Sequence, residues 1–65
     1  SINVAYKELQ TERINKLNLE INKLKDSISH FDVDSIRYAH ALSSIKNLNT
    51  RLEMTKTIDT LMDGN

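Results

Sequence analysis

The sequence predicts an all-α fold, specifically an antiparallel, coiled-coil-like hairpin of two helices. Apolar side chains recur about twice in every seven residues, proline is absent, and the single glycine is Gly64, one residue from the end. Tight β-turns need internal glycine or proline, which this chain lacks. Alternating spacings of three and four residues are instead typical of helices that pack on other helices.

The heptad repeat is clearest between Ile14 and Leu52. With Ile14 at position a, the a positions are Ile14, Ile21, Ile28, Ser35, Leu42 and Asn49, and the d positions are Leu17, Leu24, Phe31, Tyr38, Ile45 and Leu52. Most positions between them are polar or charged. Each helix is therefore expected to bury one face against a neighbouring helix.

A turn is predicted near the middle of the chain. Residues 27–36 contain no strong helix former, and Asp32 and Asp34 are residue types that cap helix N-termini. We expect one module over residues 1–65, with a first helix at about 3–29, a turn at about 30–33 and a second helix at about 34–62, followed by Gly64. Folding back at this turn would pair Ile28 with Ile36, Ile21 with Leu42, Leu17 with Ile45, Ile14 with Leu48, and Tyr6 with Thr55.

One continuous helix in a parallel coiled coil is the alternative fold. The heptad frame passes through the predicted turn without losing phase. Isoleucine at a with leucine at d, as between Ile14 and Leu24, is also the preference of parallel two-stranded coils. The chain would then be an oligomerisation coiled coil, a structural segment of a larger protein.

No enzymatic chemistry, metal or cofactor is predicted. Cysteine is absent, and the only cluster that resembles a site is His30, Asp32 and Asp34, where capping by the aspartates is the simpler interpretation. Nine basic and nine acidic residues give zero net charge, so neither nucleic acid nor an anionic membrane is an expected partner. No apolar run approaches the roughly 18 residues of a membrane span. Together with the lack of cysteine, this favours a cytoplasmic location.

The predicted function is protein–protein interaction through exposed apolar helix faces. A two-helix hairpin of this length has a thin core, and it leaves surplus apolar residues for a partner to cover. These residues are Leu19, Val33, Ile36, Leu48, Met54, Leu61 and Met62. We expect the partner to be an amphipathic helix or a second copy of the chain, giving a hetero- or homo-oligomer, with these anchors: Leu48, Leu52, Ile58, Met62 and Ile36.

In layout, the chain resembles the small helical-hairpin co-chaperones of type III secretion needle subunits. The features in common are the length, two antiparallel helices, an acidic turn that contains Asp32 and Asp34, and a tyrosine, Tyr38, soon after it. The resemblance implies a cytoplasmic chaperone-type accessory. With a helical-repeat partner, it would sequester an aggregation-prone helical subunit before export.

Overall fold

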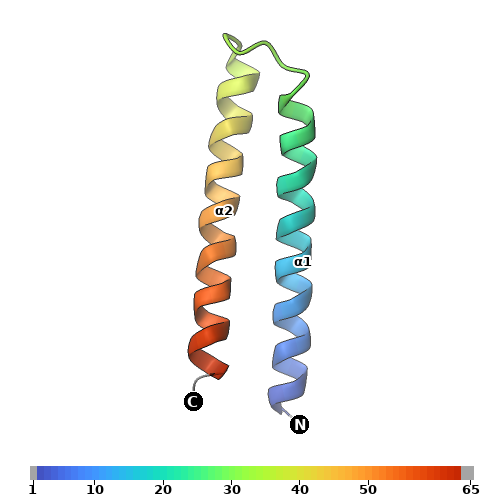
Figure 1. The fold of residues 1–65 in the computed structure, drawn as a ribbon, viewed down its shortest axis with the longest axis vertical. Helices are drawn as coiled ribbons and strands as arrows, with labels where there is room; N and C mark the ends of the chain where they lie inside the picture. Colours follow the sequence, from blue (N-terminus) through green and yellow to red (C-terminus); the bar gives the residue numbers. More distant parts are fainter. Residues whose placement is uncertain (1, 64–65) are drawn as a thin grey trace.

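The chain folds as a hairpin of two antiparallel α-helices. The computed structural model describes residues 2–63, and the side chains of residues 4–62. Helix α1 spans Ile2–Ile28 and helix α2 spans Ile36–Asp63. Both ends of the chain lie at the same end of the molecule, which measures 49 × 16 × 11 Å (Figure 1). The predicted two-helix hairpin is confirmed, and the continuous helix is wrong. Gly64, which is predicted to follow the second helix, lies outside the described residues.

Helix α1 ends without a glycine. The backbone N–H of His30 donates to the Ser27 carbonyl oxygen at 3.0 Å, and that of Phe31 donates to the Ile28 carbonyl oxygen at 3.2 Å. These bonds between residues three apart tighten the end of the helix and satisfy carbonyl groups that an α-helix leaves unpaired. No described residue has a positive φ angle. Ordinary residues can therefore form the whole connection.

Helix α2 begins two residues later than predicted, and Ser35 caps it. The Ser35 hydroxyl oxygen accepts a hydrogen bond from the backbone N–H of Tyr38 at 3.1 Å, and the Ser35 carbonyl oxygen accepts the first helical bond, from Ala39, at 3.3 Å. The side chain of Asp32 instead accepts from the backbone N–H of Asp34 at 3.3 Å, within the loop. The prediction that the aspartates cap the helix is therefore wrong, because Asp32 is engaged in turning the chain before the helix starts.

The face of α1 that is predicted to pack on the other helix, which we call its seam, is confirmed. It extends further than expected. Buried and half-buried side chains follow one another at spacings of three and four residues, in the order Tyr6, Gln10, Ile14, Leu17, Ile21, Leu24 and Ile28. Gln10 lies seven residues before Leu17, at the same heptad position. It is 3% exposed, whereas its apolar neighbour Leu9 is exposed.

The seam of α2 follows the predicted frame at its d positions, Tyr38, Ile45 and Leu52, but not at its a positions. Its buried and half-buried residues are Tyr38, Ala41, Ile45, Leu48, Leu52, Thr55 and Asp59. Leu42, which the predicted frame places in the core, is 51% exposed, and Asn49 is also exposed. Ala41 and Leu48 take the places of Leu42 and Asn49, so the second row of the seam lies one residue earlier than predicted.

The two helices are also paired in a different register from the predicted one. Leu17 lines a surface groove together with Arg51 and Thr55 of α2, which lie beyond its predicted partner Ile45. At the loop end, α2 extends past the end of α1 (Figure 1), and Ile36 is 75% exposed instead of packing on Ile28. The connecting residues continue past the last turn of α1 before α2 starts (Figure 1), so Ile36 lies beyond the reach of Ile28.

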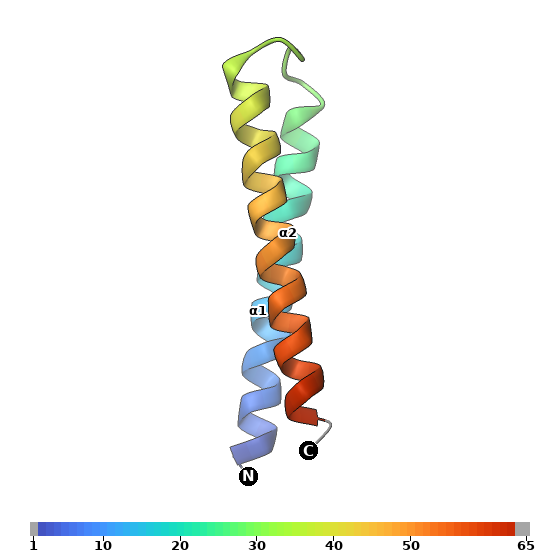
Figure 2. The same cartoon turned by 90° about the vertical axis from the view of Figure 1, so that its left-hand side faces the viewer.

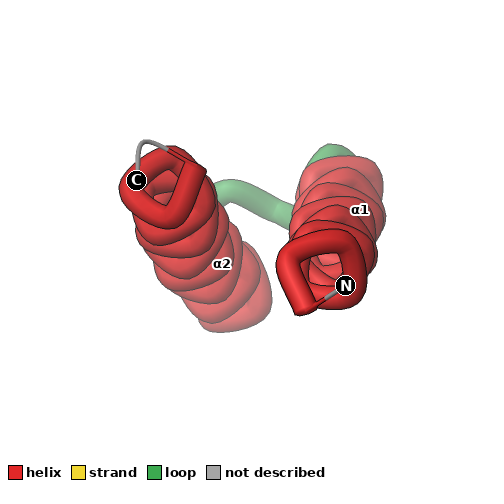
Figure 3. Tube along the Cα trace, turned by 90° about the horizontal axis from the view of Figure 1, so that it is seen from below, coloured by secondary structure: helices red, strands yellow, loops and turns green. Residues whose placement is uncertain are grey.

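The helices remain side by side along their length with a slight mutual tilt (Figures 2 and 3). This arrangement is that of antiparallel neighbours in helical bundles, where each helix presents one face to its partner. Every other face of both helices is left without a covering layer.

Candidate protein-binding surface

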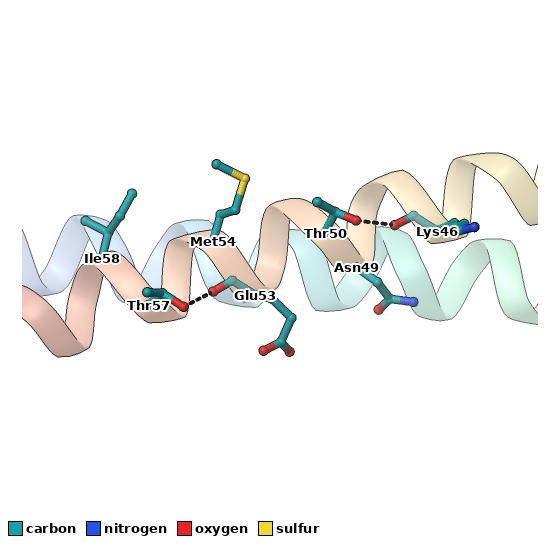
Figure 4. Close-up of a pocket in the computed structure, with 7 residues that line it drawn as sticks. All are labelled: Lys46, Asn49, Thr50, Glu53, Met54, Thr57 and Ile58. Atoms are coloured by element: carbon teal, nitrogen blue, oxygen red, sulfur yellow. Dashed lines mark hydrogen bonds between the residues drawn. The ribbon is translucent and has the colours of Figure 1, made fainter.

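Apolar side chains that face away from the seam gather on the last turns of α2. Four of them are exposed and follow one another at the spacing of a single helix face: Met54, Ile58, Leu61 and Met62. We call these four residues the terminal apolar stripe. Offsets of four, seven and eight residues place them on one side of the helix. Figure 4 shows Met54 and Ile58 projecting to the same side of α2.

A shallow open hollow of about 560 Å³ adjoins this stripe. Its lining is mostly apolar and is formed by these residues: Lys46, Asn49, Thr50, Glu53, Met54, Thr57 and Ile58. The hydroxyl of Thr50 donates to the Lys46 carbonyl oxygen at 3.1 Å, and that of Thr57 donates to the Glu53 carbonyl oxygen at 2.9 Å (Figure 4). Because both hydroxyl groups are bonded to their own helix, these threonines offer mainly their methyl groups to a ligand.

Helix α1 contributes apolar surface beside the stripe. The groove that contains Leu17 is lined by residues of both helices: Arg13, Lys16, Leu17 and Glu20 of α1, and Arg51 and Thr55 of α2. Seven residues nearer the chain ends, the corresponding positions of α1 are Tyr6, Leu9, Gln10 and Arg13, and those of α2 are Ile58 and Met62. Since seven residues are close to two helical turns, these side chains line the same side of the hairpin. The heptad spacing therefore places Tyr6 and Leu9 of α1 on the same side of the hairpin as Ile58 and Met62 of α2.

A polar side chain is buried in this part of the hairpin. Gln10 is the buried polar residue of the described part of the chain, and its Oε1 accepts a hydrogen bond from Nη1 of Arg13 at 3.1 Å. Half-buried Thr55 and Asp59 belong to the corresponding part of the α2 seam. Because Arg13 lies on the same helix, this hydrogen bond offsets part of the cost of burying the amide without involving α2.

The predicted anchor residues fall into two groups. Ile58 and Met62 belong to the terminal apolar stripe, and Ile36 lies exposed at the opposite end of α2. Leu52 is 6% exposed and Leu48 is half-buried, so both belong to the seam that holds the hairpin together. Met54 and Leu61 complete the stripe. From the sequence, they are predicted only to be apolar residues that the hairpin leaves uncovered.

The burial of Gln10 in place of Leu9 is not predicted from the sequence. Leu9 and Gln10 exchange the positions that their polarity suggests, and hydrophobicity alone gives no indication of this. The heptad spacing from Leu17 back to Gln10 was the available signal.

The loop residues His30, Asp32 and Asp34 are exposed. Within the described part of the chain, no group of three or more histidine, cysteine or acidic side chains is placed to hold a metal ion. Among residues 2–63, neither helix has the combination of length and apolar character that crossing a bilayer requires.

Comparisons with protein-family models, with curated proteins and with solved structures find no match to this chain.

Proposed function

We propose that this chain is a protein–protein association module that binds an amphipathic helix along the terminal apolar stripe. The observation that carries the proposal is the exposure of Met54, Ile58, Leu61 and Met62 on one face of a folded hairpin. Clustered apolar side chains on the surface of a small protein mark interaction sites, whereas scattered ones do not. Anchors at these offsets suit a second helix laid along the first.

The physical driving force is the burial of these side chains. Covering one Met, Ile or Leu side chain fully contributes about 1.5–3 kcal/mol, and part of this is lost to the ordering of both partners. Met54 and Met62 add adaptability, because a flexible and polarizable thioether chain fits partners of different shape. The hollow beside Met54 and Ile58 offers a place for a side chain of the partner helix.

A labelled model peptide tests this proposal. The probe is a fluorescent amphipathic helix of about three heptads with leucine at a and d and no net charge. Fluorescence anisotropy should report saturable binding to the native chain. Replacing Met54 by glutamate should weaken binding at least tenfold, which corresponds to about 1.4 kcal/mol, because it removes an anchor and places a charge against apolar surface.

The matched control is Leu19→Glu. Leu19 is 57% exposed and Met54 is 60% exposed, but Leu19 lies on α1, away from the stripe. Glutamate is a good helix former, so both substitutions should leave the hairpin folded. Equal affinity of the two variants for the peptide, or no binding by the monomeric chain, would contradict the proposal.

The resemblance to secretion co-chaperones specifies one form of this function. In that form, the bound helix would belong to a subunit that aggregates when left uncovered. This remains a prediction, as does the alternative in which the chain is an oligomerising segment of a larger protein.

A further inference from the structure

We infer that the helix that covers this surface is α2 of a second copy, packed antiparallel in a symmetric dimer. This inference rests on the proposed function and names the helix that covers Met54, Ile58 and Leu61 of the terminal apolar stripe. It is drawn from three observations: the excess surface of the monomer, the absence of charge along one face of α2, and the spacing of the residues on that face.

The isolated hairpin exposes more surface than a compact protein of its mass. Its accessible surface is 5323 Å², whereas a compact monomer of this mass exposes about 4,200 Å². Its radius of gyration is 15.1 Å, against about 11 Å for a compact chain of this length. The excess, about 1,100 Å², is close to the roughly 800 Å² that each partner buries in an interface of standard size.

The face of α2 opposite its seam is exposed and uncharged along the whole helix. Moving along this face, the residues are Ile36, Ala39, Ser43, Asn47, Thr50, Met54, Ile58 and Leu61, and all are exposed. We call these eight residues the uncharged α2 row. The corresponding face of α1 includes Glu8, Glu12 and Asp26. Since charged residues are depleted at the centres of protein interfaces, the uncharged α2 row is the more suitable contact face.

The spacing of this row is the same in both directions. Successive members are three, four, four, three, four, four and three residues apart. Two antiparallel copies therefore match along the full row, with a twofold axis between Asn47 and Thr50. Such an isologous contact closes as a dimer and leaves no row open for further copies.

Antiparallel packing also matches large side chains with small ones. Met54 of one copy would face Ser43 of the other, and Ile58 would face Ala39, while Ile36 and Leu61 would meet at each end of the row. Parallel packing would instead place Met54 on Met54 and Ser43 on Ser43. Facing residues of unequal size interdigitate without gaps, so the antiparallel arrangement is favoured. The chain has zero net charge, and two copies therefore meet without net repulsion.

The first test is the mass in solution. Sedimentation equilibrium between about 1 μM and 200 μM should show conversion of the 7.5 kDa chain to a species of twice that mass. Asn47→Glu should prevent this conversion, because it places two carboxylates beside the twofold axis. The same substitution at exposed Asn22 of α1 should leave the dimer intact.

The second test is the orientation of the two copies. A single spin label at residue 37, introduced by Arg37→Cys, should give an intermolecular distance of about 35 Å or more in the antiparallel dimer, since residue 37 would then lie level with residue 60 of the other copy. A parallel dimer would give about 15 Å instead, and that result would overturn the arrangement.

The peptide experiment separates this inference from the proposed function. Asn47 lies outside the terminal apolar stripe, so the Asn47→Glu chain should still bind the model peptide. A native chain that stays monomeric at every concentration but binds the peptide would overturn the dimer and leave the proposed function standing. A monomer that binds no peptide would overturn both.

Discussion

Ser35 decides where α2 begins. Its hydroxyl group donates to the Asp32 carbonyl oxygen at 2.7 Å, and the same oxygen atom accepts from the backbone N–H of Tyr38 at 3.1 Å. One side chain thus closes the turn and satisfies an amide that the helix cannot pair internally. Asp34 has the right chemistry for a cap, but it lies one residue too early in the chain.

We predict that Ser35→Ala lowers the free energy of unfolding by about 1 kcal/mol, the usual cost of losing an N-cap. Asp34→Ala should change it by less than about 0.5 kcal/mol, because only the backbone of Asp34 takes part in the turn. Urea denaturation followed by circular dichroism at fixed protein concentration measures both values. A larger loss for Asp34→Ala than for Ser35→Ala would contradict this account of the helix start.

Gln10 shows what residue-level reasoning from sequence leaves out. Hydrophobicity places Leu9 inside and Gln10 outside, and the structure has the reverse. The difference arises because the seam is set by helix geometry over many turns, and a single polar residue is carried inside when its neighbours on the seam are buried. Its hydrogen bond with Arg13 reduces the cost of that burial.

At the scale of the helix, the sequence predicts α1 better than α2. In α1, the a and d residues from Ile14 to Ile28 form the seam as expected. In α2, the d residues Tyr38, Ile45 and Leu52 lie in the seam as expected, but Ala41 is buried and Leu42 is exposed, although leucine is the larger apolar residue. The choice between these neighbours depends on how far the chain rotates between Ile28 and Ile36. Backbone hydrogen bonds within the loop determine that rotation, and hydrophobic periodicity carries no information about it.

The revised seam of α2 predicts unequal effects for two identical substitutions. Leu52→Ala should destabilise the hairpin by about 2–4 kcal/mol, because it creates a cavity at a buried position. Leu42→Ala should cost less than about 1 kcal/mol, because half of that side chain already meets solvent. Urea denaturation of both variants at the same protein concentration provides the comparison. Similar losses of unfolding free energy at the two positions would contradict the revised seam. They would support the predicted heptad frame, in which both leucines face the core.

At the scale of the whole molecule, the hairpin has little interior. Among residues 4–62, the buried apolar side chains are Ile21, Ala41, Ile45 and Leu52, and none of the larger side chains is fully enclosed. A single core in a chain this short rarely supplies more than about 3–5 kcal/mol. The sequence predicts this small core from length and composition alone. The uncharged α2 row, which a second copy would cover, can be identified only once the seam of α2 is known.

The stability of the native chain should therefore depend on its concentration. Because association stabilises the folded state by mass action, a hundredfold increase in concentration should raise the melting temperature by about 10 °C. Melting followed by circular dichroism at the helical band measures this shift. Asn47→Glu should melt at a lower temperature that does not change with concentration, while Asn22→Glu should behave like the native chain. A native melting temperature that is the same at every concentration would show that two helices are sufficient, and that the uncharged α2 row needs no cover for the fold to persist.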